Sequence, residues 1–206
     1  IPTGPIAGGY FGSNDIELYP YDPQKAKELL AEAGYPNGLK LPTQYISSLT
    51  DYSDKMLYVQ DQLKRVGIDM PLQEVDHATY HANVRKDLNQ IVLYGYVRTP
   101  HADVPLTQFF YGASTVGKPT AVTNFIHYDK ADKLIEQART EMDAEKAKNL
   151  YAQIEKQIMD DAVVVPLAEV ATVLVRRKEV DLGYVDDNLE GAMIYGYPIN
   201  ENTTGN

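Results

Sequence analysis

The sequence contains no cysteine and no tryptophan among its 206 residues. Without cysteine, a disulfide scaffold, a thiolate zinc site and a cysteine nucleophile are excluded. Basic residues are also scarce: 19 Lys and Arg stand against 29 Asp and Glu, and the net charge is −10. Because nucleic acids and anionic membrane surfaces are bound by clustered Lys and Arg, neither partner is expected. No apolar run reaches the roughly 18 residues that a membrane-spanning helix needs.

The composition that remains is that of a globular protein, with 44% hydrophobic and 23% charged residues. Its aromatic residues are mostly phenolic, since there are 16 Tyr and only 4 Phe. Tyrosine combines a flat apolar face with a polar tip, which suits a half-buried sheet and equally a pocket for a polar ligand. The chain begins with Ile1-Pro2 and has neither an initiator Met nor a basic leader. We therefore expect a piece of a longer protein.

Hydrophobic periodicity predicts a succession of strands and helices, which indicates an α/β fold with a mixed sheet flanked by helices. The first helix has the clearest limits, because Asp22 is a suitable N-cap, Pro23 follows it and Gly34 ends the apolar pattern. Helices are predicted at residues 22–34, 52–66, 77–86, 129–139 and 143–160, and strands at 41–48, 68–75, 90–97 and within 163–175. We expect one α/β domain over residues 1–206, with an extended lead-in at 1–21 and a tail at 198–206.

The segment from Arg98 to Tyr128 breaks this alternation and is rich in Pro, Gly and Thr. Loops of this length within a compact domain are uncommon and are usually functional. It directly follows the strand predicted at residues 90–97. Since ligands of α/β domains often bind just outside strand ends, we expect binding residues there.

Three motifs come close to catalytic or cofactor signatures, and each lacks a residue that the chemistry requires. The segment 112–119 resembles a phosphate-binding loop, but Pro119 stands where the magnesium-binding hydroxyl is needed. His77 and His81 have metal-capable i, i+4 spacing, yet the glutamate of a zinc-protease motif is absent, so two solvated histidines are expected. Ser114 lacks the second glycine of a nucleophile elbow. No catalytic residue, metal ligand or cofactor is predicted.

The first helix carries the sequence YDPQKAKELLAEAGYPNG at residues 21–38. It resembles the Y-D-P-x-K-A-K-x-L-L-x-E-A-G-Y-x-x-G stretch of the family-5 extracellular solute-binding proteins, which are receptors of peptide, nickel and oligosaccharide ABC transporters. Further similar motifs follow in the family's order. These are QLKRVGI at 62–68, ARTEMD at 138–143 followed by LY at 150–151, VVVPL at 163–167 and RRKEV at 176–180.

The resemblance implies that the chain is the C-terminal lobe of a type II periplasmic-binding-protein fold. A solute would be held between this lobe and an N-terminal lobe that the chain lacks. The implied function is non-enzymatic: a small polar solute is captured outside the cytoplasm, in the periplasm or an equivalent compartment, and passed to the permease subunits of an ABC importer.

The family's ligand-facing residues map onto two stretches of this sequence. The loop after the third strand contributes Tyr96, Arg98, Thr99, His101 and Asp103, and the strand at 41–48 contributes Tyr45 and Ser47. Thr99 stands where peptide receptors carry an aspartate that pairs with the ligand's ammonium group. With Arg98 beside it, the loop favours an uncharged or anionic polar solute.

Two other classes of function remain open from the residues alone. A hydrolase on an α/β scaffold would need a nucleophile and a base, and His101 is the only histidine in the candidate loop before position 127. A receptor-like signalling module would instead have a protein partner.

Overall fold

The computed structural model describes residues 2–96, 100–119, 123–170, 177, 179–181 and 204–205. The chain forms two compact units. The α/β unit consists of Tyr19–Gly95 and Gly112–His127, and the helical unit of Ile1–Leu18, Tyr96–Tyr111 and Tyr128–Asn206. The predicted single lobe over residues 1–206 stays a prediction.

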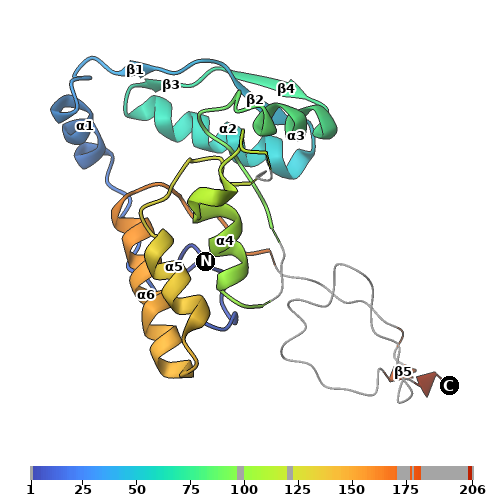
Figure 1. Cartoon of the computed structure of the whole chain (residues 1–206). Coiled ribbons are helices and arrows are strands. Elements are labelled where there is room, and N and C mark those ends of the chain that lie inside the picture. The colour runs from blue at the N-terminus through green and yellow to red at the C-terminus, as the bar shows by residue number, and fades with distance from the viewer. Residues whose placement is uncertain are drawn as a thin grey trace. The chain divides into compact units, whose positions relative to one another are not determined.

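The α/β unit is built from two pairs of parallel strands and three helices (Figure 1). β1 (Leu39–Lys40) pairs with β3 (Ile68–Asp69), and β2 (Gln44–Ser47) pairs with β4 (Leu72–Val75). The helices are α1 (Pro23–Glu32), α2 (Thr50–Arg65) and α3 (His77–Arg85), followed later in the chain by the short 3₁₀ helix η1 (Gly112–Ser114). The predicted helices and strands up to residue 86 occur in the predicted order, with Pro71 separating β3 from β4. Strand β1, which precedes the strand predicted at 41–48, was not predicted.

Local signals set the limits of the helices in this unit. The side chain of Asp22 accepts a hydrogen bond from the Lys25 N–H at 2.9 Å and caps α1, and Asp76 caps α3 through Thr79 N–H at 3.0 Å. Gly34 follows α1 with φ +93°, a conformation that only glycine adopts without strain.

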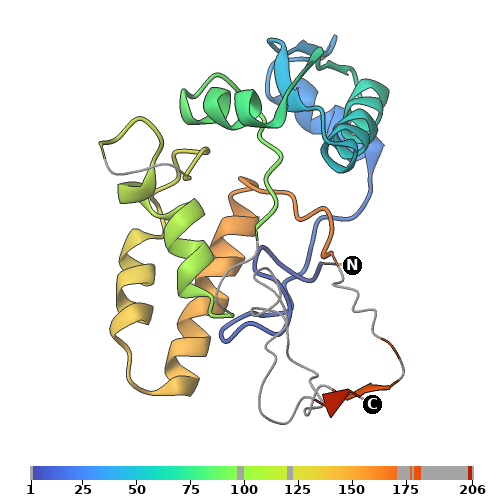
Figure 2. The same cartoon turned by 90° about the vertical axis from the view of Figure 1, so that its right-hand side faces the viewer.

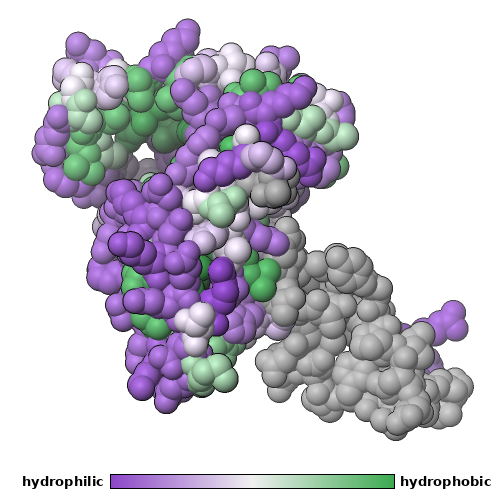
Figure 3. Space-filling view, in the orientation of Figure 1, coloured by the Kyte–Doolittle hydropathy of each residue, from purple (hydrophilic) through white to green (hydrophobic). Residues whose placement is uncertain are grey.

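The core of the α/β unit is small. One cluster of buried side chains consists of Ile46, Met56 and Met70, and Tyr80 and Val84 of α3 are buried as well. Helix α1 has no buried residue, and its Leu29 is 51% exposed. Apolar surface is accordingly visible beside α1 in the space-filling view (Figure 3).

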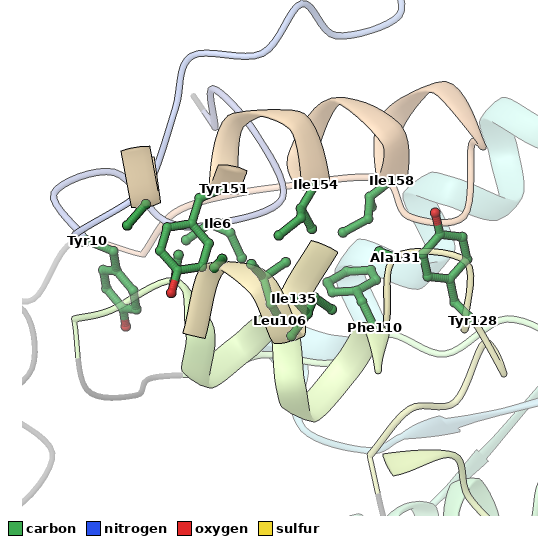
Figure 4. Packing of buried hydrophobic residues seen from close by; sticks show 13 residues of the cluster. Ile6, Tyr10, Leu106, Phe110, Tyr128, Ala131, Ile135, Tyr151, Ile154 and Ile158 are labelled. Atoms are coloured by element: carbon green, nitrogen blue, oxygen red, sulfur yellow. The ribbon is translucent and has the colours of Figure 1, made fainter. Parts of the chain in front are cut away.

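The helical unit is held by three packed helices, α4 (Asp103–Phe110), α5 (Asp132–Thr140) and α6 (Ala144–Asp160), as Figure 2 shows. The N-terminal segment also contributes to their core. Figure 4 shows the cluster, which includes Ile6, Tyr10, Leu106, Phe110, Tyr128, Ile135, Tyr151, Ile154 and Ile158. Gly12, with φ +85°, lets the N-terminal segment approach α6 closely, because a Cβ at this position would collide with the ring of Tyr151.

The strand predicted at residues 90–97 is wrong for its described part, residues 90–96. The backbone N–H groups of Gln90 and Ile91 donate to the side-chain oxygen of Gln44, at 2.9 and 3.0 Å, instead of to a neighbouring strand. The segment therefore lies along β2 through a side-chain amide, and no strand ladder forms.

The prediction of an irregular segment from Arg98 to Tyr128 is also wrong in part, since α4 occupies Asp103–Phe110. Pro105 lies in the first turn of α4, where backbone N–H groups have no intrahelical acceptor. The proline therefore costs the helix no hydrogen bond. No strand occurs at residues 163–170, and 171–175 lie outside the described residues. Val180, the last residue of the RRKEV motif, begins β5 (Val180–Asp181), which pairs antiparallel with β6 (Thr204–Gly205).

Candidate ligand-binding site

The α/β unit brings polar and aromatic side chains together at the carboxyl ends of β2 and β4. Ser47 and Val75 are paired at these ends, and α3 begins directly after β4. In parallel sheets this edge is where ligands usually bind. Tyr45 and Ser47 are two residues apart in β2, so their side chains share one face of the strand pair.

Ser47 is connected to two histidines on the first turns of α3. Its hydroxyl lies 2.9 Å from Nδ1 of His77, and Nε2 of His77 lies 3.1 Å from Nε2 of His81. Ser47 is fully buried, and its Oγ also accepts from the Leu49 N–H at 3.2 Å. Both histidines are partly buried, so the prediction of two solvated rings is wrong.

Tyrosines surround the histidine pair. Tyr52 of α2 meets His77 edge to face at 5.4 Å, and Tyr94 meets His81 in the same way at 5.6 Å. Tyr80, whose hydroxyl donates to the Leu93 carbonyl at 2.6 Å, lies against both Tyr52 and His81. Burial, together with the neighbouring His77 and Arg85, lowers the pKa of His81 and favours its neutral form.

A second buried amide secures Tyr45 in this region. Asn89 accepts from the Tyr45 N–H at 3.2 Å and donates to the Tyr45 carbonyl at 2.7 Å, as an adjacent strand would. The Tyr45 backbone is thus fixed, while its side chain is only half buried.

In the helical unit, Tyr96 lies against the core. Its ring is tilted against Phe109, with centroids 5.2 Å apart, and its hydroxyl donates to the Pro5 carbonyl at 3.3 Å. Burial raises the pKa of Tyr96 to about 12, so the phenol is neutral and acts as a donor.

His101 and Asp103 form the start of α4. Nδ1 of His101 accepts from the Asp103 N–H at 3.2 Å, and the His101 ring packs on Phe11 at 5.0 Å. The Asp103 carboxylate lies 3.2 Å from Nε of Arg139 on α5 and also accepts from Thr107 at 3.3 Å. Asp103 therefore already has a cationic partner.

The seven predicted site residues thus fall into three groups. Tyr45 and Ser47 belong to the α/β unit, and Tyr96, His101 and Asp103 belong to the helical unit. Arg98 and Thr99 lie outside the described residues. Sequence reasoning missed the side chains that join Ser47 at its strand end, and the i, i+4 spacing of His77 and His81 was the signal that pointed to them.

Lys118, from the loop that resembles a phosphate-binding motif, is engaged within the α/β unit, since its Nζ donates to the Gly112 carbonyl. No group of three or more His, Cys, Asp and Glu side chains is placed to hold a metal ion within the described ranges. Among the helices that the structure describes, none has the length and apolar character that crossing a bilayer demands.

Comparison with known proteins identifies relatives over nearly the whole chain. Glutathione-binding protein GsiB from Pectobacterium atrosepticum is 30% identical over 191 residues, which cover 88% of this chain and 36% of the relative. GsiB from Escherichia coli K12 is 31% identical over 173 residues, 80% of this chain and 33% of its own length. The chain therefore spans about a third of the length of these relatives.

Solved structures show the same fold. MoaA from A. tumefaciens R10, in complex with mannopinic acid, has a TM-score of 0.81 and 37% identity, and the match covers 98% of this chain and 40% of MoaA. DppA from Helicobacter pylori, in complex with the peptide STSA, has a TM-score of 0.72 and 27% identity over 81% of this chain and 32% of DppA. HbpA2 from Haemophilus parasuis, at 21% identity, shares the fold over the whole chain with a TM-score of 0.77. The predicted α/β, periplasmic-binding-protein-like fold class is confirmed.

The middle-region model of the bacterial extracellular solute-binding proteins, family 5, matches residues 2–118, more than half of the chain. Together with the GsiB and MoaA similarities, this match confirms the resemblance seen in the helix at residues 21–38. The chain belongs to family 5 of the bacterial extracellular solute-binding proteins.

Proposed function

We propose that this chain is part of the substrate-binding component of an ABC importer, and that the complete receptor captures a small polar solute. The observation that carries the proposal is the match to MoaA, which extends over 98% of the chain at 37% identity and with a TM-score of 0.81. The family match over residues 2–118 supports a binding protein over the hydrolase and signalling alternatives.

The proposed solute is uncharged or anionic. A receptor for free peptides would place a carboxylate beside the ligand's ammonium group, a charge-assisted contact of about 1.5–3 kcal/mol. Asp103 is the acidic residue closest in sequence to the position of that carboxylate, but it is paired with Arg139 and Thr107. The ligand of MoaA, mannopinic acid, is an acid by name and agrees with this class.

In the proposed mechanism the solute binds between this chain and a second lobe supplied by the rest of the receptor. The contacts proposed for the solute are Arg98 and Thr99 in the loop before α4. Binding of the solute shifts the equilibrium between open and closed receptor toward the closed form, which a permease recognises. The size of this shift is set by how much more tightly the solute binds the closed form than the open form. The working compartment is the periplasm or the equivalent outer face of the membrane, and no cofactor is required.

The direct test is a titration of the complete receptor with mannopinic acid, glutathione, a dipeptide and a neutral sugar. We expect mannopinic acid to bind most tightly and Arg98→Ala to weaken it at least tenfold, because the arginine fork is lost. Arg85→Ala, at the exposed end of α3, is the matched control and should bind as the unaltered receptor does. Tightest binding of the dipeptide, undisturbed by Arg98→Ala, would reject the proposed solute class.

Glutathione is the second candidate, because the curated relatives at 30–31% identity are named glutathione-binding proteins. It would be favoured if its affinity exceeded that of mannopinic acid in the same titration. Failure of every compound in the panel, combined with measurable turnover of an ester or glycoside, would favour the hydrolase alternative.

A further inference from the structure

The histidine pair on α3 has a geometry that solute capture does not explain. Nε2 of His77 and Nε2 of His81 approach to 3.1 Å. Because the residues are separated by four positions, both rings project from one face of the helix. We propose that His77 and His81 form a two-nitrogen binding site for a divalent transition-metal ion such as Cu²⁺ or Zn²⁺.

The nitrogen spacing suits coordination of one ion by both rings. A zinc–imidazole bond is about 2.0–2.1 Å long, so two nitrogens of one tetrahedral centre are roughly 3.4 Å apart. The observed 3.1 Å requires only a small adjustment of the two rings. Imidazole is a ligand suited to zinc, copper and nickel, whereas calcium and magnesium prefer oxygen ligands.

Ser47 provides the supporting contact that metal-binding histidines commonly have. Its Oγ lies 2.9 Å from Nδ1 of His77, the nitrogen on the opposite side of the ring from His81. When Nδ1–H donates to this oxygen, the lone pair of Nε2 is left for a metal. Since Ser47 is fully buried and also bound by the Leu49 N–H, it holds the orientation of His77, and its oxygen is available to accept from Nδ1–H.

Neighbouring aromatic rings hold the pair in place before any ion arrives. Tyr52 packs on His77 with centroids 5.4 Å apart, and Tyr94 packs on His81 at 5.6 Å. Rings that are already ordered lose little conformational freedom on binding, which favours affinity. Two protein nitrogens leave the remaining coordination positions to water, so the expected site is exchangeable.

A hydrogen bond between the two neutral rings would give a similar distance, and a copper titration separates the two interpretations. Cu²⁺ alone is titrated into the 206-residue chain by calorimetry at neutral pH, with electron paramagnetic resonance of the one-equivalent sample. We expect one ion per chain and hyperfine coupling to two imidazole nitrogens. His77→Ala and His81→Ala should each weaken binding at least tenfold, and Ser47→Ala should weaken it about tenfold through His77.

His127→Ala is the matched control, because His127 is paired with Asp87 at 2.9 Å and has no contact with the histidine pair in the described structure. This variant should keep both the affinity and the two-nitrogen spectrum. Circular dichroism checks that each variant is folded, and His81→Gln, which keeps most of the side-chain volume, replaces His81→Ala if that variant is not. The proposal is overturned if no stoichiometric binding occurs, or if folded His77 and His81 variants bind Cu²⁺ as tightly as the unaltered chain.

Discussion

The two units of the chain are stabilised by different kinds of contact. The helical unit encloses a cluster of thirteen buried apolar residues, among them four large side chains of α6 and α5 (Ile135, Tyr151, Ile154 and Ile158). In the described part of the α/β unit six apolar side chains are buried: Ile46, Met56 and Met70 in one cluster, and Tyr80, Val84 and Val116 outside it. The unit also exposes large apolar side chains such as Leu57, which is 50% accessible. Its segment at residues 89–91 is joined to β2 by side-chain amides.

This difference indicates where stability and adaptability reside. Buried apolar area is the main source of folding free energy, so the helical unit should be the more resistant of the two. The α/β unit carries the polar and aromatic edge at Ser47 and His77, and a lower local stability is typical of binding regions. Substitutions that act through burial should therefore have their largest effects in the helical unit.

The largest effect is expected for Ile154→Ala on α6. Ile154 is fully buried in the centre of the cluster, and truncation of such a side chain costs the transfer free energy plus that of the cavity left behind. We expect a loss of about 4 kcal/mol, measured by native-state hydrogen exchange of the α5 and α6 amides. Leu57→Ala on α2 is the control, with an expected change below about 0.5 kcal/mol, because Leu57 is half exposed. Equal losses for both variants would contradict the contrast between the units.

The next effect concerns the buried carboxyl group of the helical unit. Glu155 is fully buried; its Oε1 accepts from Asn14 at 2.9 Å, and its Oε2 has no hydrogen-bond partner among the described residues. Burial raises the pKa of Glu155 to about 7. An unfolded glutamate titrates near 4.3, so the folded protein binds this proton more tightly than the unfolded chain does. Protonation of Glu155 therefore stabilises the folded state, and the full stabilisation is present below about pH 4.3.

The unfolding free energy should therefore fall as the pH rises from about 4.5 to 7, by about 3 kcal/mol from this residue. Urea unfolding at several pH values measures the effect. Glu155→Gln cannot ionise and should lack this part of the pH dependence, whereas Glu136→Gln, on the exposed face of α5, should retain it. A wild-type pH profile in the Glu155→Gln variant would show that the dependence has another origin.

In the α/β unit, the comparison is sharpened by Gln44→Ala. Gln44 is fully buried, and its side-chain oxygen accepts from both Gln90 and Ile91. Removing it leaves two backbone donors unpaired, at a cost of about 2 kcal/mol. Hydrogen exchange should accelerate at residues 89–91 and in β2, with little change in α5 and α6. Gln153→Ala, at an exposed position of α6, is the control. Unchanged exchange at residues 89–91 would contradict the role of the Gln44 amide.

The parts of the fold that the sequence predicts are those with local determinants. The starts of α1, α3 and α6 follow from Asp22, Asp76 and Asp143, whose side chains cap the helix that begins next to them. Helix α4 was missed because its Pro105 and the glycines that follow suggest a loop, although proline is tolerated in a first turn.

The errors elsewhere arise from contacts between residues distant in sequence. The apolar run at 90–96 resembles a strand, but Gln44, 46 residues before Gln90, takes its hydrogen bonds. Likewise, the periodicity of α3 places His77 and His81 on one face but carries no information on Ser47, which lies 30 residues earlier. Ser47 itself was named through the family resemblance of the strand at 41–48, whereas its partners required the structure.

The smallest effect compares one substitution in both units: removal of an aspartate N-cap. Asp143 accepts from the Glu145 and Lys146 N–H groups at 3.1 and 3.0 Å and caps α6, which is packed in the core. Asp22 caps α1 in the same way, but α1 buries no residue. Loss of a cap costs about 1 kcal/mol, so Asp143→Ala should lower the stability of α6 by that amount in hydrogen exchange. Asp22→Ala should instead increase exchange within residues 23–32 and leave α2 and β2 unchanged, because little packing depends on α1.

Asp143→Asn and Asp22→Asn, which keep a capping oxygen, are the controls. If Asp22→Ala lowered the protection of α2 as strongly as Asp143→Ala lowers that of α6, α1 would be an integral part of its unit despite its exposure.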